Sequence, residues 1–266
     1  MNTWWFLWPL LAMVAALLAL GPLGVHVLRR GVVFIDLAIA QSAAAGALVA
    51  LSLGHHPAWW ITQSTAFLGA LLAAGAVAFL ASRWPQQREA LIGLIYVASA
   101  TIALLTARLD AHGGDHLHGL LAADVLWAEP TQVAALGVCA LAVLIMRAHL
   151  HLDRWFYPLF ALVASIAVQA LGLFVVFAAL IAPALWQSRR RWGLASALTL
   201  CGLSCGVGLV LSWMLDAPSG PLIALGLAIT GVVSAWPAGI IDRHPPLPSG
   251  QPVGSSANRH PEHHRD

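Results

Sequence analysis

Long runs of apolar residues without a charged side chain dominate this sequence and leave few folds open to it. The seven blocks are Met1–Leu28, Leu37–Ser82, Ala90–Ala107, Thr131–Met146, Trp155–Ser188, Trp192–Leu215 and Ala217–Ile241. A helix needs about 20 apolar residues to cross a bilayer. The blocks are too long and too uniformly apolar for outer-membrane strands, which alternate apolar and polar residues over about ten positions. We therefore predict an all-α polytopic membrane helical bundle with eight or nine spans.

The number of spans depends on the block Trp155–Ser188. Its 34 residues would make one helix of about 51 Å, much longer than a hydrocarbon core of about 30 Å. Gly172 lies at its middle and Pro183 near its end, and both residue types interrupt helices. Two crossings, which we prefer, give nine spans, whereas one tilted helix gives eight.

Arginine positions predict the orientation, because cytoplasmic loops retain Arg and Lys. The basic turns Arg29–Arg30, Arg83–Arg88 and Arg147–Arg154 alternate with the uncharged turn Gly54–Pro57 and the acidic, His-rich loop Arg108–Glu129. The basic turns are therefore placed inside, and the amino terminus outside.

The composition changes after Ile241, where Pro, Ser, Gly, His and Arg replace the apolar residues. We expect a transmembrane permease domain over residues 1–241. Residues 242–266 are expected to form a disordered, His- and Pro-rich cytoplasmic tail.

The sequence argues against several function classes. All thirteen basic residues are arginine, so a nucleotide-binding P-loop, which requires a lysine, is excluded. No nucleophile and base at credible spacing, paired catalytic carboxylates or cofactor-binding glycine motif occurs. We expect no enzyme activity in this chain and no nucleic-acid partner.

Four segments, taken in order, point to one family. Gly21–Gly46 combines a glycine-containing span, a paired arginine turn and an early acidic residue, and Arg88–Leu104 opens a span with an acidic residue and Ile-Gly. Gly172–Leu185 ends in Leu-Ile-Ala-Pro-Ala, and Asp216–Leu225 begins Asp-Ala-Pro-Ser-Gly. Together they resemble the membrane subunit of bacterial ABC importers for zinc and manganese, the metal-uptake permease family.

The resemblance implies a permease in the bacterial inner membrane that carries a divalent transition metal ion, zinc or manganese, with no permanently bound cofactor. It implies a homodimer in membrane lipid, cytoplasmic ABC ATPase subunits that hydrolyse ATP in separate chains, and a periplasmic metal-binding protein. The family's docking pattern, an acidic residue followed by Ala-x-x-x-Gly, is missing from Arg147–Trp155. A stand-alone channel or secondary carrier, or a non-transporting scaffold derived from a permease, is therefore kept as an alternative.

Asp36 and Gln41 are the candidate residues of the translocation path. Asp36 is the one acidic residue well inside a predicted span, where an unpaired carboxylate is costly. It either lies on a cation path, with the Gln41 oxygen nearby, or forms a salt bridge with the Arg29–Arg30 turn. Family members usually place a histidine where this chain has Gln41, and this difference weakens the case for zinc.

The outward loop concentrates possible metal ligands. Its candidates are His112, Asp115, His116 and His118, which stand among glycines. Imidazole and carboxylate groups on a flexible turn suit Zn²⁺ or a similar ion, but a merely polar loop would have the same composition. On the inward side, Arg147, Asp153 and Arg154 are the residues expected to face the ATPase.

Overall fold

The described part of the chain is entirely helical apart from its connections. The computed structural model describes residues 6–53, 58–108, 113–121, 123, 125–190 and 193–235. They belong to a compact unit, Met1–Ala235. The second unit, Trp236–Asp266, lies outside the described residues, and it includes the whole predicted tail, residues 242–266. No strand occurs in the described ranges, so the all-α prediction is confirmed.

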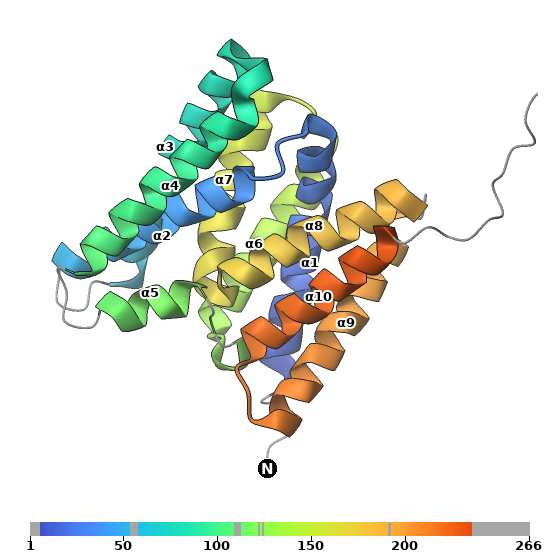
Figure 1. The fold of residues 1–266 in the computed structure, drawn as a ribbon. Coiled ribbons are helices and arrows are strands. Elements are labelled where there is room, and N and C mark those ends of the chain that lie inside the picture. Colours follow the sequence, from blue (N-terminus) through green and yellow to red (C-terminus); the bar gives the residue numbers. More distant parts are fainter. Residues whose placement is uncertain are drawn as a thin grey trace, which may run out of the picture. The chain divides into compact units, whose positions relative to one another are not determined.

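The described residues of this unit form ten α-helices (Figure 1). They are α1 (Leu7–Arg30), α2 (Ile35–Leu53), α3 (Trp59–Arg83), α4 (Arg88–Ala107), α5 (Gly113–Leu121), α6 (Pro130–Met146), α7 (Asp153–Leu171), α8 (Leu173–Arg190), α9 (Leu194–Leu215) and α10 (Ser219–Ala235). Short 3₁₀ turns, η2 (Pro85–Gln87) and η3 (Val125–Trp127), precede α4 and α6.

Six of the described helices are long and apolar enough to cross a membrane, namely α1, α2, α3, α4, α7 and α9. Three more, α6, α8 and α10, are apolar but slightly shorter. Such a polytopic bundle agrees with the predicted eight or nine spans. The short helix α5 lies in the outward loop that the sequence predicted to be a flexible turn.

The block Trp155–Ser188 forms two helices, as the preferred interpretation predicted. The break falls at Gly172, whose backbone adopts φ 80° and ψ 158°. This region is open essentially to glycine alone. Gly172 still donates its N–H to the Val168 carbonyl at 2.9 Å, and its own carbonyl accepts from Val176 at 3.2 Å. Pro183 lies within α8 without ending it.

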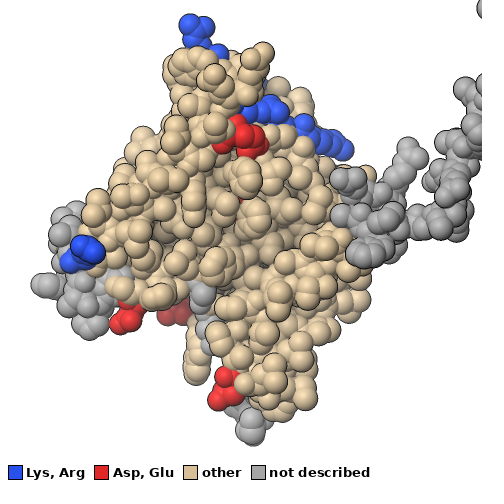
Figure 2. All heavy atoms as spheres, in the orientation of Figure 1, with Lys and Arg blue, Asp and Glu red and all other residues tan. Residues whose placement is uncertain are grey.

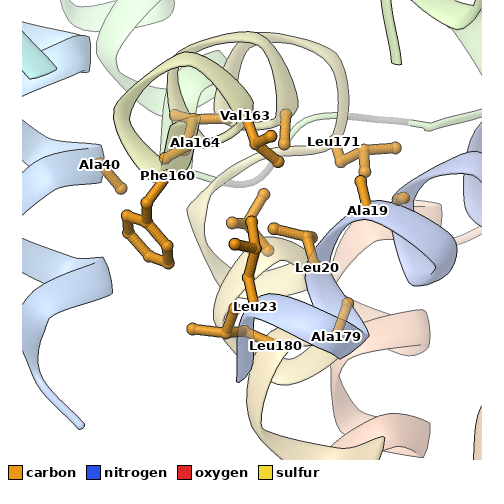
Figure 3. Packing of buried hydrophobic residues seen from close by; sticks show 14 of the residues in the cluster. Ala19, Leu20, Leu23, Ala40, Phe160, Val163, Ala164, Leu171, Ala179 and Leu180 are labelled. Atoms are coloured by element: carbon orange, nitrogen blue, oxygen red, sulfur yellow. The ribbon is translucent and has the colours of Figure 1, made fainter. Parts of the chain in front are cut away.

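The core forms where α1, α7 and α8 meet. Leu20 and Leu23 of α1 pack with Phe160 of α7 and Leu180 of α8, and all four are buried (Figure 3). The approach of α1 to α8 depends on Gly24, because a Cβ at this position would collide with the Leu180 carbonyl group.

A second close contact joins α2 to α3. A Cβ at Gly46 would meet the Thr65 backbone, and one at Gly69 would meet the Ser42 backbone. Small residues of this kind let membrane helices pack backbone to backbone. The Ser42 hydroxyl lies 2.6 Å from that of Ser99 and thereby links α2 to α4.

Candidate cation path

The turn between α1 and α2 places Asp36 in the first turn of α2. Gly31 ends α1 in the left-handed region, with φ 62°. Its N–H donates to the Leu28 carbonyl at 3.1 Å, and the Val32 N–H donates to the Val27 carbonyl at 3.4 Å. This pair of hydrogen bonds is a common helix ending that glycine favours. The chain therefore reverses quickly, and α2 starts at Ile35.

The Asp36 side chain is fully buried, with 0% of its surface exposed. Neither carboxylate oxygen has a hydrogen-bond partner in the described part of the chain. Burying a carboxylate without a partner is costly. This position therefore calls for a proton or a cation, because the described residues provide neither a basic side chain nor a donor for it.

Arg30, the partner that the salt-bridge alternative required, is bound elsewhere. Its Nη2 donates to Asp153 Oδ1 at 3.0 Å, to the Leu150 carbonyl at 3.0 Å and to the His151 carbonyl at 3.2 Å. Its guanidinium also stacks over the Phe156 ring, 4.0 Å from the centroid. The observed salt bridge thus joins the end of α1 to the start of α7 and leaves Asp36 unpaired.

Gln41 is also buried, with 4% of its surface exposed, and its Oε1 has no described partner. Five residues along an α-helix correspond to a rise of about 7.5 Å and a rotation of about 140°. Asp36 and Gln41 therefore project from different sides of α2. A cation bound to both at once would need α2 to deviate from regular geometry, so we treat them as separate positions along the helix.

A cavity of about 370 Å³ with a mixed apolar and polar lining lies on the side of the bundle that the arginine pattern places outside; we call it the outer cavity. Its polar lining comes from four helices: Thr62 of α3, Asp115 of α5, Gln132 of α6 and Gln169 of α7. One carboxylate and several neutral oxygens suit a hard or hydrated divalent cation. Sequence reasoning identified Asp115 but missed the other three, although an amide inside an apolar block was an available signal.

Hydrogen bonds connect this cavity to the helices beneath it. Gln63, next to Thr62, donates its Nε2 to the Ser165 hydroxyl at 3.4 Å, and Gln169 donates to the Ser165 carbonyl at 3.1 Å. Ser165 is buried in α7. Polar groups of α3 and α7 thus extend inward from the cavity between helices that also contact α2.

The His-rich loop is only partly described. His112 lies outside the described residues, and the side chain of His116 is among those not described. Asp115 and His118 are exposed on α5. Across the described residues, no three His, Cys, Asp or Glu side chains come close enough to hold a metal ion. The metal role of this loop stays a prediction.

The three residues expected to face the ATPase differ in their surroundings. Asp153 holds Arg30, whereas Arg147 is exposed. Arg154 is also exposed and lies 5.8 Å from the Trp155 ring centroid. Between α6 and α7 the chain has only residues 147–152, which form turns and no helix. The docking segment missing from the sequence is thus also missing from this connection.

The sequence profile of the ABC 3 transport family matches residues 5–151 and 149–238. This chain belongs to the ABC 3 transport family. This match confirms the resemblance to bacterial metal-uptake permeases that the four sequence segments indicated. With its several apolar helices, the chain is a multi-pass protein of the bacterial inner membrane.

Relatives of this ABC 3 protein match over most of their length. An uncharacterized membrane protein of Synechocystis is 28% identical over 255 residues, with 84% of this chain and 88% of the relative covered. A protein of Chlamydia muridarum named a probable metal transport system membrane protein is 22% identical, with 83% and 84% covered. A protein of the same name from Chlamydia trachomatis is 21% identical, with 81% and 83% covered.

Two solved structures share the fold of this ABC 3 chain. PsaBC from Streptococcus pneumoniae, solved in complex with a Fab, aligns with a TM-score of 0.69 at 18% identity and covers 89% of this chain and 93% of its own. A transporter described as of the metal-chelate ABC type, in an inward-facing conformation, aligns with a TM-score of 0.60 at 19% identity and covers 86% and 85%.

Proposed function

We propose that this chain is the permease of an ABC importer that carries a divalent transition metal ion inward past Asp36. The observation that carries the proposal is the fully buried Asp36 carboxylate, which has no described partner in a chain of this family. A divalent cation passing this position would offset the cost of the buried charge. The outer cavity with Asp115 would receive the ion first.

Manganese fits the described donors better than zinc does. The polar groups of the cavity and of α2 are carboxylate, amide and hydroxyl oxygens, which suit Mn²⁺, whereas zinc prefers imidazole and thiolate. Gln41 stands where family members usually have a histidine. The three cysteines, Cys139, Cys201 and Cys205, are buried in α6 and α9 and do not line the outer cavity.

The partners follow from the proposed importer. The chain would form a homodimer, receive metal from a periplasmic binding protein and depend on two cytoplasmic ATPase subunits. The inward turns, with Arg147, Asp153 and Arg154, would meet those subunits. A lone secondary carrier is the second candidate, because the connection of residues 147–152 provides no docking helix. In that case metal uptake would continue without any ATPase subunit.

The decisive experiment measures Mn²⁺ uptake by proteoliposomes that contain the permease and its ATPase, and compares Asp36→Asn with Asp216→Asn. Asp216 is exposed in the α9–α10 turn with φ 50°, a conformation that asparagine adopts readily. Asp36→Asn should lower uptake per folded molecule at least about tenfold, since losing one charged ligand costs more than about 1.4 kcal/mol of affinity. Asp216→Asn should transport normally. Unchanged uptake by Asp36→Asn would remove Asp36 from the path.

The outward loop has its own test. Replacing His112, His116 and His118 together with alanine should raise the Mn²⁺ concentration needed for half-maximal uptake and leave the maximal rate nearly unchanged. This result is expected if the loop captures metal without forming the obligatory path. Unchanged uptake at limiting metal would make it a polar loop only.

A further inference from the structure

A cavity of about 350 Å³ opens on the arginine side of the bundle, away from the outer cavity. Its walls come from the end of α1, the α1–α2 turn, the inner end of α3 and the starts of α4 and α7. The charged residues in its lining are Arg29, Arg30, Arg88 and Asp153. Its volume is within the range of small-ligand sites.

The charges in this cavity do not balance. Asp153 is occupied by Arg30. Arg29 and Arg88 have no acidic partner anywhere in the described ranges. Two guanidinium groups therefore face the cavity without an anion, although guanidinium groups bind carboxylates and phosphates strongly.

The Arg88 guanidinium lies close to Gly31 in the α1–α2 turn. Its Nη2 lies 2.7 Å from the position that a Cβ on Gly31 would occupy. A side chain at residue 31 would therefore push the guanidinium away. Gly31 thus both ends α1 and leaves room for the Arg88 guanidinium beside the cavity.

The cavity lies at the level expected for lipid headgroups. Trp84 and Trp155, which flank it at the inner ends of α3 and α7, are partly exposed, and tryptophan is enriched at membrane interfaces. Ser82 lines the cavity, and it lies on the same side of α3 as Phe79, which is 64% exposed. The lipid-facing side of α3 thus leads into the cavity. Figure 2 shows arginine atoms at this end of the bundle, with acidic atoms close to them.

We propose that this cavity binds the phosphate headgroup of an anionic phospholipid from the inner leaflet, with Arg29 and Arg88 as its charged ligands. Basic pockets between membrane helices on the cytoplasmic side suit such headgroups. Free inorganic phosphate has the same binding chemistry and is a separate arm of the test. The continuity with the exposed side of α3 favours the lipid over an acidic side chain from a cytoplasmic protein.

The test uses the purified full chain in detergent and measures retained lipid by native mass spectrometry. Dioleoyl phosphatidylglycerol is compared with dioleoyl phosphatidylcholine for the wild type, the double variant Arg29→Gln/Arg88→Gln and the control Arg83→Gln. Arg83 is exposed in the same region and does not line the cavity. At about fivefold for each arginine, the double variant should bind phosphatidylglycerol about twenty-five-fold more weakly. Arg83→Gln should stay within about twofold of the wild type.

A second measurement guards against misfolding and identifies the source of the phosphate. Short-chain dioctanoyl phosphatidylglycerol should raise the melting temperature of the wild type and of Arg83→Gln but not of the double variant, whose lipid-free melting temperature should be normal. Equal stabilisation by inorganic phosphate would overturn the lipid assignment in favour of a free phosphate site. Undiminished phosphatidylglycerol binding by the double variant would also overturn it.

Discussion

Replacing Gly24 with alanine should loosen the contact between α1 and α8. The added Cβ would lie 2.9 Å from the Leu180 carbonyl carbon, closer still to the carbonyl oxygen, and 3.4 Å from the Ala184 Cβ. The obstacle is backbone, so it cannot turn away as a flexible side chain would. The two helices must separate, and overpacking of this kind costs about 1–3 kcal/mol.

The control for this prediction is the same substitution at Gly75. This glycine lies in α3, and a Cβ there would meet nothing within 4 Å. Alanine is favoured over glycine inside a helix by about 1 kcal/mol. Thermal denaturation in detergent should therefore show a lower melting temperature for Gly24→Ala and an equal or higher one for Gly75→Ala. Equal melting temperatures for Gly24→Ala and the wild type would refute the backbone contact.

Three further predictions concern the turns. Gly172→Ala should destabilise the protein by about 1–3 kcal/mol in thermal denaturation, because alanine is strained at φ 80°. An unchanged melting temperature would mean that the fold does not need the glycine conformation at the break between α7 and α8. Arg30→Ala should lower the melting temperature more than Asp153→Asn does. Arg30 also binds two carbonyl groups and stacks over the Phe156 ring. Asp153 is 72% exposed, so the ion pair that it forms contributes at most about 1 kcal/mol. In a cysteine-free variant, an impermeant maleimide should label Ala58→Cys but not Gln86→Cys in intact cells, and labelling of both would reject the predicted orientation.

Most of the helical architecture could be predicted because it depends on local properties. Charge-free apolar blocks correspond to the long helices, and the break in Trp155–Ser188 falls at Gly172 since only glycine adopts that conformation easily. The helix α5 was missed. Its glycines, Gly113 and Gly114, favour turns locally, but Leu117 packs on a small apolar cluster that stabilises the helix.

The candidate site could be predicted only in part, because it depends on residues far apart in the chain. Asp36 was evident as an acidic residue in an apolar block, but its lack of a partner was not. Arg30 lies six positions away in sequence, yet it binds Asp153, 123 positions away. The outer cavity combines side chains from four helices. One sequence does not indicate such long-range packing.

The reciprocal glycines of α2 and α3 constrain how this protein can evolve. Gly46 and Gly69 each lie against the backbone of the opposite helix, so a larger residue at either would move both helices apart. A larger residue at one of these positions cannot be compensated by a smaller residue at the other, because glycine already has no side chain. Among functional descendants of this protein, both positions should therefore be conserved as glycine, while lipid-facing neighbours such as Leu72 vary freely among apolar residues.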